Sequence, residues 1–552
     1  MKRLIALLAT LLLAGCATLP TELDVQAGPE LVAPTGQEFS YYSPASPAIG
    51  ASAQEIVSGF LAAGTGPQND YAVARQYLSA DFAQRWQPTA ETLIRSGAPS
   101  FRESGDTVQL VDVSLGARLD EHGRYSDLSP AESATLRFQL VREAGEWRIA
   151  AAPNLTVVTQ PVFSVVFSAF PIYFVDTRYR FLIPDLRWFP SRASTPTRLV
   201  TALLAGPSSW LDNSATSAIP EGTGLTINAV SVEAGVARVD FDANALAADA
   251  ASRQVMLTQL RSTLIQISGV TQVAISVNNS PQDIEPSDLS DSTNLGPTFA
   301  LTNDGVQRVN VAEQLPLSGT DNIVDSYQPE RFTIGDEGRK IGFSNPDGIY
   351  LLERDGLSLR ISQLSETGEV ASLEFDSFGA LWVFPLDASS PIEIYDMRGA
   401  SRTIPSDIEG RRIWGTLSPE GGRLVQAIES LTGESVLNVE TISRDSAMIP
   451  LRTNPGLVVR PVVGVPISLT WHGSNAIRVL EQTASGLSAL SEYPLTGPRR
   501  PLTMPPVVGV QLLSGPSSIS TYLLSETGEL WTLSGNTWRQ GARGVLALAA
   551  MR

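Results

Sequence analysis

The second half of the chain repeats one local pattern, a strand that ends in a tight turn rich in Gly, Pro, Asp and Asn. Such turns join neighbouring antiparallel strands, because Pro presets φ and Gly accepts a positive φ. They recur at intervals of roughly 30 to 55 residues, a spacing that suits four-stranded propeller blades. The turns are Asn303-Asp304-Gly305, Pro346-Asp347-Gly348, Asp376-Ser377-Phe378-Gly379, Pro419-Glu420-Gly421-Gly422, Trp471-His472-Gly473 and Glu526-Thr527-Gly528. Residues 298–552 are therefore predicted to form an all-β propeller of about six degenerate blades, and a pair of β-sandwiches is the alternative.

The N-terminus has the pattern of a bacterial export signal. Lys2 and Arg3 precede an apolar run, and small residues follow it before the chain's single cysteine, Cys16. The segment Leu13-Ala14-Gly15-Cys16 has the form of a lipobox. We expect residues 1–15 to be a signal peptide, with cleavage between Gly15 and Cys16. The cysteine would then carry an S-diacylglyceryl group on its thiol and an N-acyl group on the freed amine. The alternative is a plain signal peptide with a chance cysteine.

This leader predicts a lipid-anchored protein on the extracytoplasmic face of the cell membrane. No later stretch reaches about 18 uncharged apolar residues, the length at which a transmembrane helix is considered. The formal net charge of −18 argues against nucleic acid as a partner, and against a basic patch that would bind anionic lipid.

Several catalytic chemistries lack their residues. The chain has two histidines, His122 and His472, both in turn-like segments, and no cysteine after Cys16. Zinc sites built on His and Cys are therefore almost excluded. The one lysine beyond the leader, Lys340, is not in a P-loop, and no Gly-x-Ser-x-Gly elbow accompanies either histidine. Carboxylates are plentiful but no pair stands out, which leaves a two-carboxylate hydrolase open. We expect no catalytic, metal-binding or cofactor-binding residue, no cofactor and no enzymatic activity.

A tether and a small folded domain follow the leader. Residues 16–50 read as the lipidated cysteine and a flexible tether, because they are rich in Pro, Gly, Ala, Ser and Thr without periodicity. Residues 51–160 are predicted to form a small α+β domain that begins with a capping box at Ser52 and Glu55. A second helix, capped by Asn69 or Asp70, would carry Tyr71, Ala74, Tyr77 and Leu78. Helices followed by alternating strands resemble the cone-shaped NTF2-like fold.

Residues 161–280 are predicted to form a second small α/β domain. Its first part is unusually aromatic, and the aromatic residues are Phe163, Phe167, Phe170, Tyr173, Phe174, Tyr179, Phe181, Trp188 and Phe189. Buried strands at an inter-domain seam explain this composition, and an exposed partner-binding face is the alternative. Thr195 is expected to cap the next helix. A strand over 236–241, a second helix and a strand over 273–277 complete the domain.

Several motifs in this domain occur in the order found in the GerMN domain, which is named for sporulation and spore-germination proteins. The motifs are Tyr173-Phe174-Val175-Asp176, Leu203-Leu204-Ala205-Gly206-Pro207, Ser217-Ala218-Ile219-Pro220-Glu221-Gly222-Thr223, Val239-Asp240-Phe241, Gln259-Leu260-Arg261-Ser262-Thr263-Leu264 and Gly269-Val270. The resemblance implies a compact unit of envelope-associated proteins and supplies no catalytic residue. Residues 281–297 then read as an acidic linker.

The whole order of segments resembles one family, the LpqB lipoproteins of actinobacteria. It comprises the lipobox, an NTF2-like segment with Gly59-Phe60-Leu61-Ala62-Ala63-Gly64-Thr65, a GerMN domain and a degenerate propeller. The resemblance implies an extracytoplasmic lipoprotein that contacts an MtrB-like sensor kinase of the MtrA-MtrB type. Signalling for cell-envelope homeostasis and division would be modulated by that contact.

Two hypotheses of different classes follow. The favoured one is a non-enzymatic accessory protein, tethered through Cys16, that docks on a membrane sensor. The alternative is a cell-wall glycan- or peptide-binding protein, or an envelope hydrolase, that uses the propeller. The hydrolase predicts carboxylates that converge in the propeller mouth, one of them with a raised pKa. The accessory protein predicts an apolar or aromatic patch without such a pair.

Overall fold

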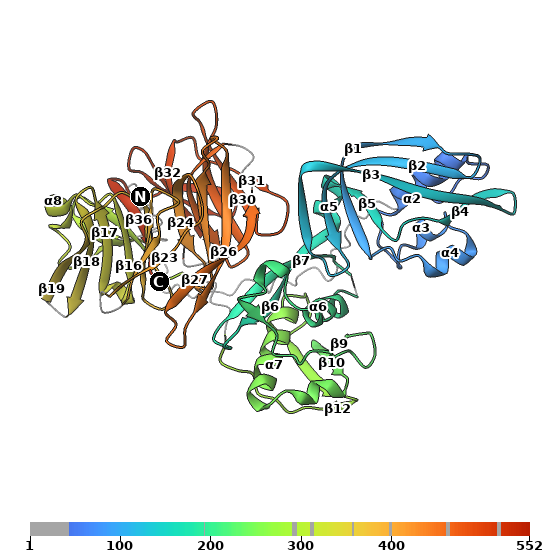
Figure 1. Ribbon diagram of the computed structural model, residues 1–552, viewed down its shortest axis with the longest axis horizontal. Helices are drawn as coiled ribbons and strands as arrows, with labels where there is room; N and C mark the ends of the chain where they lie inside the picture. The colour runs from blue at the N-terminus through green and yellow to red at the C-terminus, as the bar shows by residue number, and fades with distance from the viewer. Residues whose placement is uncertain are drawn as a thin grey trace, which may run out of the picture. The chain divides into compact units, whose positions relative to one another are not determined.

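The computed structural model describes residues 44–192, 194–289, 295–309, 314–355, 358–396, 400–459, 464–515 and 520–552 (Figure 1). The predicted signal peptide, Cys16 and most of the predicted tether lie outside these residues. Residues 45–552 form one compact unit, which is described below.

The first region combines three short helices with a five-stranded sheet of order β4-β3-β2-β1-β5. Its elements are α2 (Ala53–Ala63), α3 (Ala72–Arg75), α4 (Ala80–Arg85), β1 (Glu91–Glu103), β2 (Val108–Asp120), β3 (Tyr125–Glu143), β4 (Glu146–Ala151) and β5 (Thr156–Thr159). The capping box predicted at Ser52 and Glu55 is present at the start of α2. Helix α2 packs against β2, β4 and β5, and the core lies between them.

The second helix predicted for this region is much shorter than its periodicity suggests. Asn69, Asp70 and Tyr71 all have positive φ values, so the chain turns there instead of starting a capped helix. Helix α3 begins at Ala72, with Tyr71 as its N-cap and no side-chain cap. Leu78 then bridges to Ile149 of β4. The apolar residues of this segment are buried. Most of them are positioned by the turn at residues 69–71 and by the β-bridge of Leu78, and not by a long helix.

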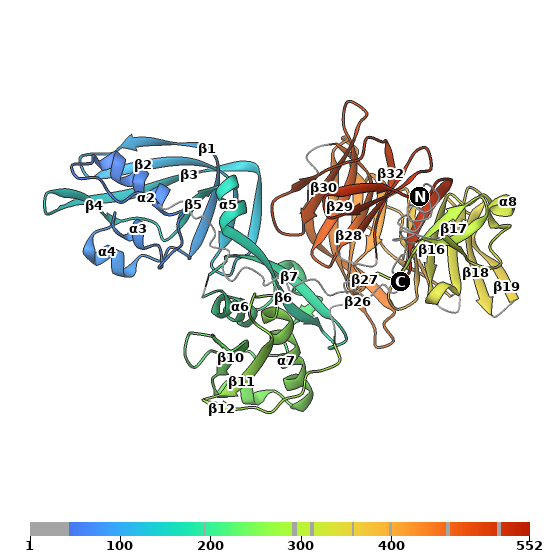
Figure 2. The same cartoon turned by 180° about the vertical axis from the view of Figure 1, so that it is seen from behind.

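The second region contains two small sheets, of order β12-β11-β10-β9 and β7-β6-β8. Strands β10 and β11 pair in parallel, and α7 is the connection between them. Helix α7 also covers β6 (Figure 2). The elements are α5 (Gln160–Val166), β6 (Phe167–Asp176), β7 (Leu182–Pro190), α6 (Thr195–Leu204), η1 (Ser209–Leu211), β8 (Ala215–Thr216), β9 (Ser231–Glu233), β10 (Val236–Phe241), η2 (Ala243–Ala247), α7 (Ala250–Leu264), β11 (Gln272–Val277) and β12 (Ser280–Pro281).

One expectation for this region is wrong and another is confirmed. Thr195 is the first residue of α6 and not its cap, because its hydroxyl accepts from the backbone N–H of Arg192 and donates to the carbonyl of Pro190. The aromatic segment forms buried strands, as the favoured explanation expected, and the alternative of an exposed partner-binding face is not supported. Seven of its nine aromatic residues are buried and the other two are half-buried. Their packing forms the core of the second region and its boundary with the first.

The aromatic segment also contacts the last region, as an inter-domain seam should. The indole Nε1 of Trp188 donates to the carbonyl of Thr496 at 2.6 Å. Phe181 packs against Phe378 with ring centroids 6.1 Å apart. These contacts join segments that are far apart in sequence, 308 positions in the case of Trp188 and Thr496.

The last region consists of six four-stranded antiparallel sheets. One short helix, α8 (Ile323–Tyr327), and the turn η3 (Asp336–Gly338) accompany them. The strands are β13 (Thr298–Thr302), β14 (Gly305–Val309), β15 (Gln314–Pro316), β16 (Arg331–Gly335), β17 (Lys340–Asn345), β18 (Gly348–Asp355), β19 (Ser358–Ser365), β20 (Val370–Phe375), β21 (Leu381–Pro385), β22 (Ile392–Tyr395), β23 (Ser401–Ile404), β24 (Arg411–Leu417), β25 (Arg423–Glu429), β26 (Ser435–Arg444), β27 (Pro450–Val459), β28 (Val465–His472), β29 (Ala476–Gln482), β30 (Ser488–Pro494), β31 (Arg500–Leu502), β32 (Gly509–Ser514), β33 (Ser520–Ser525), β34 (Leu530–Ser534), β35 (Thr537–Gln540) and β36 (Val545–Ala550).

These sheets form a closed ring. Strands β36, β16, β20, β24, β28 and β32 each contact the next in that order, and β32 contacts β36 again. Each pair of neighbouring sheets encloses its own hydrophobic core, which gives six separate cores. The last strand, β36, pairs with β13, so one sheet is built from both ends of the region. Two β-sandwiches would pair facing sheets instead, and this arrangement does not support that alternative.

Candidate functional site

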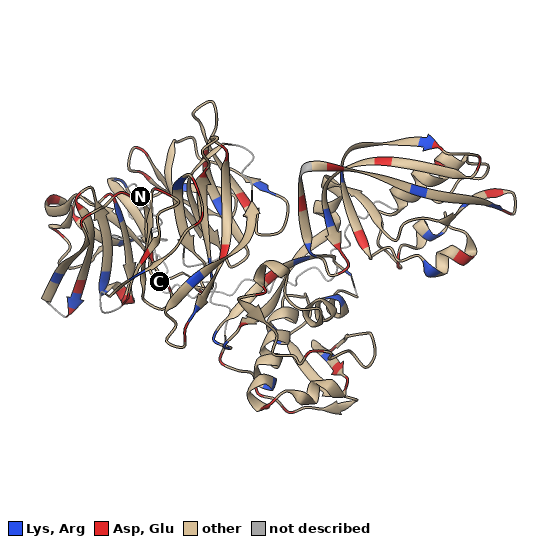
Figure 3. Cartoon of the chain, in the orientation of Figure 1, with Lys and Arg blue, Asp and Glu red and all other residues tan. Residues whose placement is uncertain are grey.

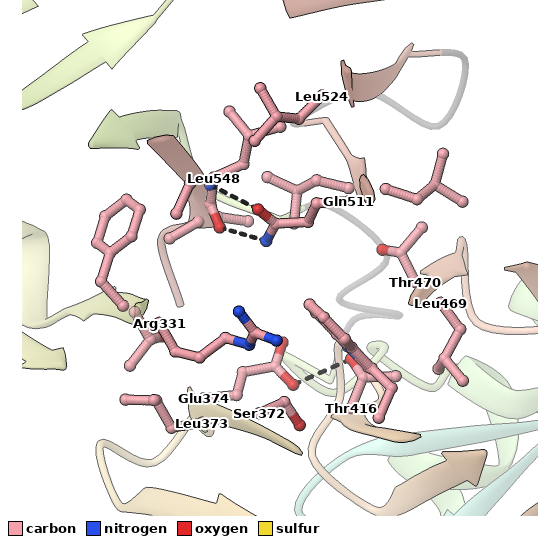
Figure 4. Close-up of a pocket in the computed structure, with 18 of the residues that line it drawn as sticks. Arg331, Ser372, Leu373, Glu374, Thr416, Leu469, Thr470, Gln511, Leu524 and Leu548 are labelled. Carbon is pink, nitrogen blue, oxygen red and sulfur yellow. Dashed lines mark hydrogen bonds between the residues drawn. The ribbon is translucent and has the colours of Figure 1, made fainter. Parts of the chain in front are cut away.

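The inner strands of the ring enclose a cavity of about 230 Å³ (Figure 4). These strands run in the same direction around the ring. Ser372 of β20 is hydrogen-bonded to Gly415 of β24. Two residues further along both strands, Glu374 is hydrogen-bonded to Leu417, so the two strands are parallel. The cavity therefore has one mouth formed by the starts of the strands and another end formed by their last residues.

Most polar side chains in the cavity wall hold neighbouring sheets together. The Ser372 hydroxyl both accepts from and donates to the backbone of Gly415. The Gln511 side chain bonds to both the N–H and the carbonyl of Leu548, each at 2.8 Å. Thr470 accepts from the N–H of Ser514 at 3.0 Å. These groups are committed to the ring, which leaves few of them for a ligand.

An ion pair between Glu374 and Arg552 lies in the cavity wall, near the last residues of the inner strands. The Arg552 Nη2 lies 2.6 Å from Oε1 of Glu374, and its Nε donates to the same oxygen at 3.0 Å. The other carboxylate oxygen accepts from the hydroxyl of Thr416 and the N–H of Leu417. Both oxygens of Glu374 are thus occupied, so this carboxylate is a structural clamp and is not free to act as a base.

The open mouth carries exposed apolar side chains, one arginine and one glutamate. Val510 and Leu546 line the cavity, lie near the starts of their strands and are exposed. Arg331 extends into the cavity toward Glu374 (Figure 4). Its guanidinium carbon lies 5.8 Å from the centre of the Trp414 ring. The mouth thus combines an apolar rim with one exposed arginine and its exposed neighbour Glu330. The other carboxylate of the lining, Glu374, is already bonded, so the lining lacks the free carboxylate pair that a hydrolase would need.

The sequence singled out two histidines, and the structure gives both a structural setting. His122 lies in the turn between β2 and β3, as predicted, but its surroundings are not the solvated ones expected. Its carbonyl accepts from the buried Arg187. Burial lowers the pKa of His122. His472, at the end of β28, has Nε2 3.0 Å from Nη2 of Arg478. Arginine only donates, so this nitrogen accepts and the ring is neutral.

His472 predicts a pH dependence of stability. Burial and the Arg478 charge lower its pKa from 6.5 to about 4. Between these values the unfolded chain binds the proton and the folded chain does not, so the free energy of unfolding falls as the pH drops from 6.5 to 4. The His472 contribution is about 3 kcal/mol. Urea unfolding at both pH values should therefore show a smaller loss for His472→Gln than for the unchanged chain.

The comparison between the two chains is essential to that experiment. Burial raises the pKa of Glu440 and of Glu481, which favours the folded state as the pH falls. These terms are common to both chains and cancel in the difference. Equal losses for the two chains would contradict the prediction.

Other kinds of site are not seen in the part of the chain that the structure describes. It holds no group of three or more His, Cys, Asp or Glu residues arranged to bind a metal ion. It also has no helix whose length and apolarity would suffice to cross a membrane. Basic and acidic residues are interspersed within each region (Figure 3). The lipidation site predicted at Cys16 lies outside the described residues.

The comparisons with known proteins match two families in succession. The family "Lipoprotein LpqB, N-terminal domain" matches residues 46–164, and the family "Sporulation and spore germination" matches residues 171–283. Both matches confirm the resemblances found in the sequence motifs.

Individual relatives extend this similarity along the chain. Lipoprotein LpqB of Cutibacterium acnes is 32% identical over 284 residues, which are 50% of this chain and 47% of that protein. The chain therefore spans about half the length of this relative. Lipoprotein LpqB of Thermobifida fusca is 24% identical over 97% of this chain and 96% of that protein. Among solved structures, TolB from Acinetobacter baumannii aligns with a TM-score of 0.36 and 11% identity, over 58% of this chain and 82% of that chain, which is too distant to inform the fold.

Proposed function

We propose that this chain, which belongs to the LpqB family of lipoproteins, is a membrane-anchored accessory protein of a two-component sensor kinase. The observation that carries the proposal is the alignment with a relative named lipoprotein LpqB over 97% of this chain and 96% of that protein. The lipobox at Cys16 supplies the anchor, on the extracytoplasmic face of the cell membrane. Anchoring both partners in one membrane raises their effective concentration.

The proposal assigns a job to each segment. Residues 1–15 are the signal peptide, and residues 16–50 carry the lipid and tether the folded part. Residues 51–160 are an NTF2-like domain, residues 161–280 a GerMN domain and residues 281–297 a linker. Residues 298–552 are a six-bladed β-propeller, an assignment supported by six four-stranded sheets in a ring and by the shared β13–β36 sheet.

A non-enzymatic role is supported by the state of the candidate catalytic groups. The two oxygens of Glu374 accept from Arg552, Thr416 and Leu417. Nε2 of His472 accepts from an arginine. The apolar rim at the ring mouth is the kind of surface expected of an interaction protein.

The test is direct binding between residues 17–552 and the purified extracellular domain of the same organism's MtrB-like kinase. We expect a Kd of about 1 μM or lower. Leu546→Asp places a charge in the rim, and Leu431→Asp makes the same change on an exposed turn of β25 and β26 as a control. Absence of binding up to high micromolar concentration would reject the proposed direct contact. A loss confined to Leu546→Asp would locate the contact at the rim.

The alternative is a cell-wall glycan- or peptide-binding protein, or an envelope hydrolase, that uses the ring cavity. The favouring observation is the open cavity itself, with Arg331 and Trp414 in its mouth. Titration with soluble peptidoglycan fragments separates the two. Fragment binding that is lost in Arg331→Gln, without kinase binding, would favour the alternative.

Cys16→Ala should release the protein from the membrane, because the thiol that accepts the diacylglyceryl group is gone. Cell fractionation should find the variant in the soluble or precursor form, with a mass that lacks lipid. Thr18→Ala is the matched control and should stay anchored. Folding should be unaffected, since the compact unit begins at Ala45. A variant that is still anchored and mass-shifted by lipid would contradict the prediction.

A further inference from the structure

A second cavity, of about 290 Å³, lies in the first region between α2 and the strands β1, β2 and β5. Its wall is mostly apolar, and the apolar residues are Leu61, Ala62, Pro99, Phe101, Val113 and Val157. The polar residues of the wall are Ser58, Thr65, Arg95 and Thr159. A small, mainly apolar cavity with a few polar groups is typical of a ligand site.

Arg95 occupies a position in β1 where the pattern favours an apolar residue. Side chains alternate along a strand. Leu93 is buried in the core beneath α2, and Ile94 belongs to the core on the other face of the sheet. Arg95 follows on the α2 face and pairs in register with Leu115, which lies in the same core as Leu93. The chain therefore places a cation on the apolar side of its sheet.

The pairing of β1 with β2 is irregular on both sides of Arg95. The register shifts between Ile94 and Arg95, and again between Ser96 and Ser100. Such bulges bend a strand and re-aim its side chains, and they are frequent next to binding sites. The second bulge contains Pro99, which lines the cavity together with Arg95. The distortion is thus located at the cavity wall.

The guanidinium of Arg95 is the charged group in the cavity wall, and some of its N–H groups are available to a ligand. It donates through Nη1 to the carbonyl of Gly97. Among the described residues, no ion pair joins Arg95 to a carboxylate, although the chain carries a net charge of −18. The neighbouring hydroxyls have local roles, since Thr65 donates to the carbonyl of Ala62 and Thr159 accepts from the N–H of Val162.

From these observations we propose that the cavity binds a small amphipathic anion. Its single acidic group bonds to the free donors of Arg95, and its apolar body lies against Phe101, Val113 and Val157. A guanidinium stays charged at any physiological pH and matches a carboxylate or sulfonate in geometry. An uncharged molecule of the same shape would gain the apolar contacts alone.

The test uses two fluorescent probes of similar shape, with the chain from residue 17 onward. 8-Anilinonaphthalene-1-sulfonate carries the acidic group, and N-phenyl-1-naphthylamine lacks it. Arg95→Gln should weaken binding of the sulfonate about tenfold and that of the neutral probe less than about twofold. Ala62→Trp, which fills the cavity from the exposed side of α2, should weaken both. Arg95→Lys retains the cation and should retain part of the preference for the anion.

Arg137→Gln is the matched control, because it removes an exposed arginine from the opposite face of the same sheet and should change neither affinity. Thermal melts establish that each variant is folded. The proposal is overturned if the unchanged chain does not bind the sulfonate or if Ala62→Trp leaves its binding intact. It is equally overturned if Arg95→Gln reduces both probes by the same factor.

Discussion

Replacing Arg187 with methionine should lower the free energy of unfolding by about 3–5 kcal/mol, because it leaves a buried carboxylate without its counter-charge. Arg187 and Asp185 are both fully buried, and Nη2 lies 2.6 Å from Oδ2. Ser208 donates to the same carboxylate through its N–H and its hydroxyl. The guanidinium also donates to the carbonyls of His122 and Gly206. The pair thus ties the first region to the second.

The effect of Asp185→Asn on the free energy of unfolding should change sign between the unchanged chain and the Arg187→Met chain. A general loss of packing would not produce such a change. Asp185→Asn should destabilise the unchanged chain, since it leaves the buried Arg187 charge unpaired. In the Arg187→Met background the same substitution should stabilise, because it removes the orphaned charge while its amide oxygen still accepts from Ser208. Urea unfolding of the unchanged chain, the two single variants and the double variant gives the double-mutant cycle that tests this.

An exposed ion pair provides the control for burial. Arg102 and Asp112 also form a close pair, at 2.7 Å, but on the surface of the first sheet. Arg102→Gln should leave the melting temperature almost unchanged, because water screens an exposed pair. Equal effects of Arg187→Met and Arg102→Gln would show that burial does not govern these pairs.

The buried pair also illustrates why the sequence predicted local features better than the site. All nine residues of β7 are buried, Asp185 and Arg187 included. A strand that is buried on both faces has no alternation of apolar and polar residues in its sequence. Charged residues within it, such as Asp185 and Arg187, are then easily taken for exposed residues. The aromatic segment shared this ambiguity, and contacts such as those of Trp188 with Thr496 and of Phe181 with Phe378 show that part of it lies at a seam.

Turns and caps could be predicted because their physics is confined to a few residues. The capping box at Ser52 and the Pro346-Asp347-Gly348 turn between β17 and β18 are examples. The repeats looked irregular because equivalent turns join different strands. The turn at Gly348 joins the second and third strands of its sheet, whereas that at Gly421 joins the first and second.

The cavity groups could not be predicted, because their partners are remote in sequence. Glu374 meets Arg552 across 178 positions. In the sequence Leu373-Glu374-Phe375, the glutamate looks like an ordinary outward-facing strand residue. The alternation of β1 around Arg95 holds a usable signal, since Arg95 follows Leu93 on the face of the strand that packs in the apolar core.

Deleting residues 545–552 should prevent the ring from folding as one unit. The deletion removes β36, so β13 keeps its pairing with β14 but becomes an edge strand, and the backbone groups that faced β36 are left without hydrogen bonds. Two of the six cores also lose residues, since Ala547 and Ala549 belong to one, and Val545 and Leu548 to the next. Limited proteolysis should therefore cleave within residues 298–544 while residues 45–289 stay protected, and the melting curve should lose the ring's transition.

The deletion also removes the Arg552 clamp, and a point variant separates the two effects. Glu374→Gln breaks the ion pair but retains β36, so it should lower the ring's melting temperature while its protease resistance persists. Glu330→Gln, at an exposed position of the same cavity, should have little effect. A synthetic peptide of residues 545–552, added in trans, should restore protection, because the missing strand would again pair with β13. Unchanged protection of the truncated chain without the peptide would mean that the other five sheets hold the ring closed by themselves.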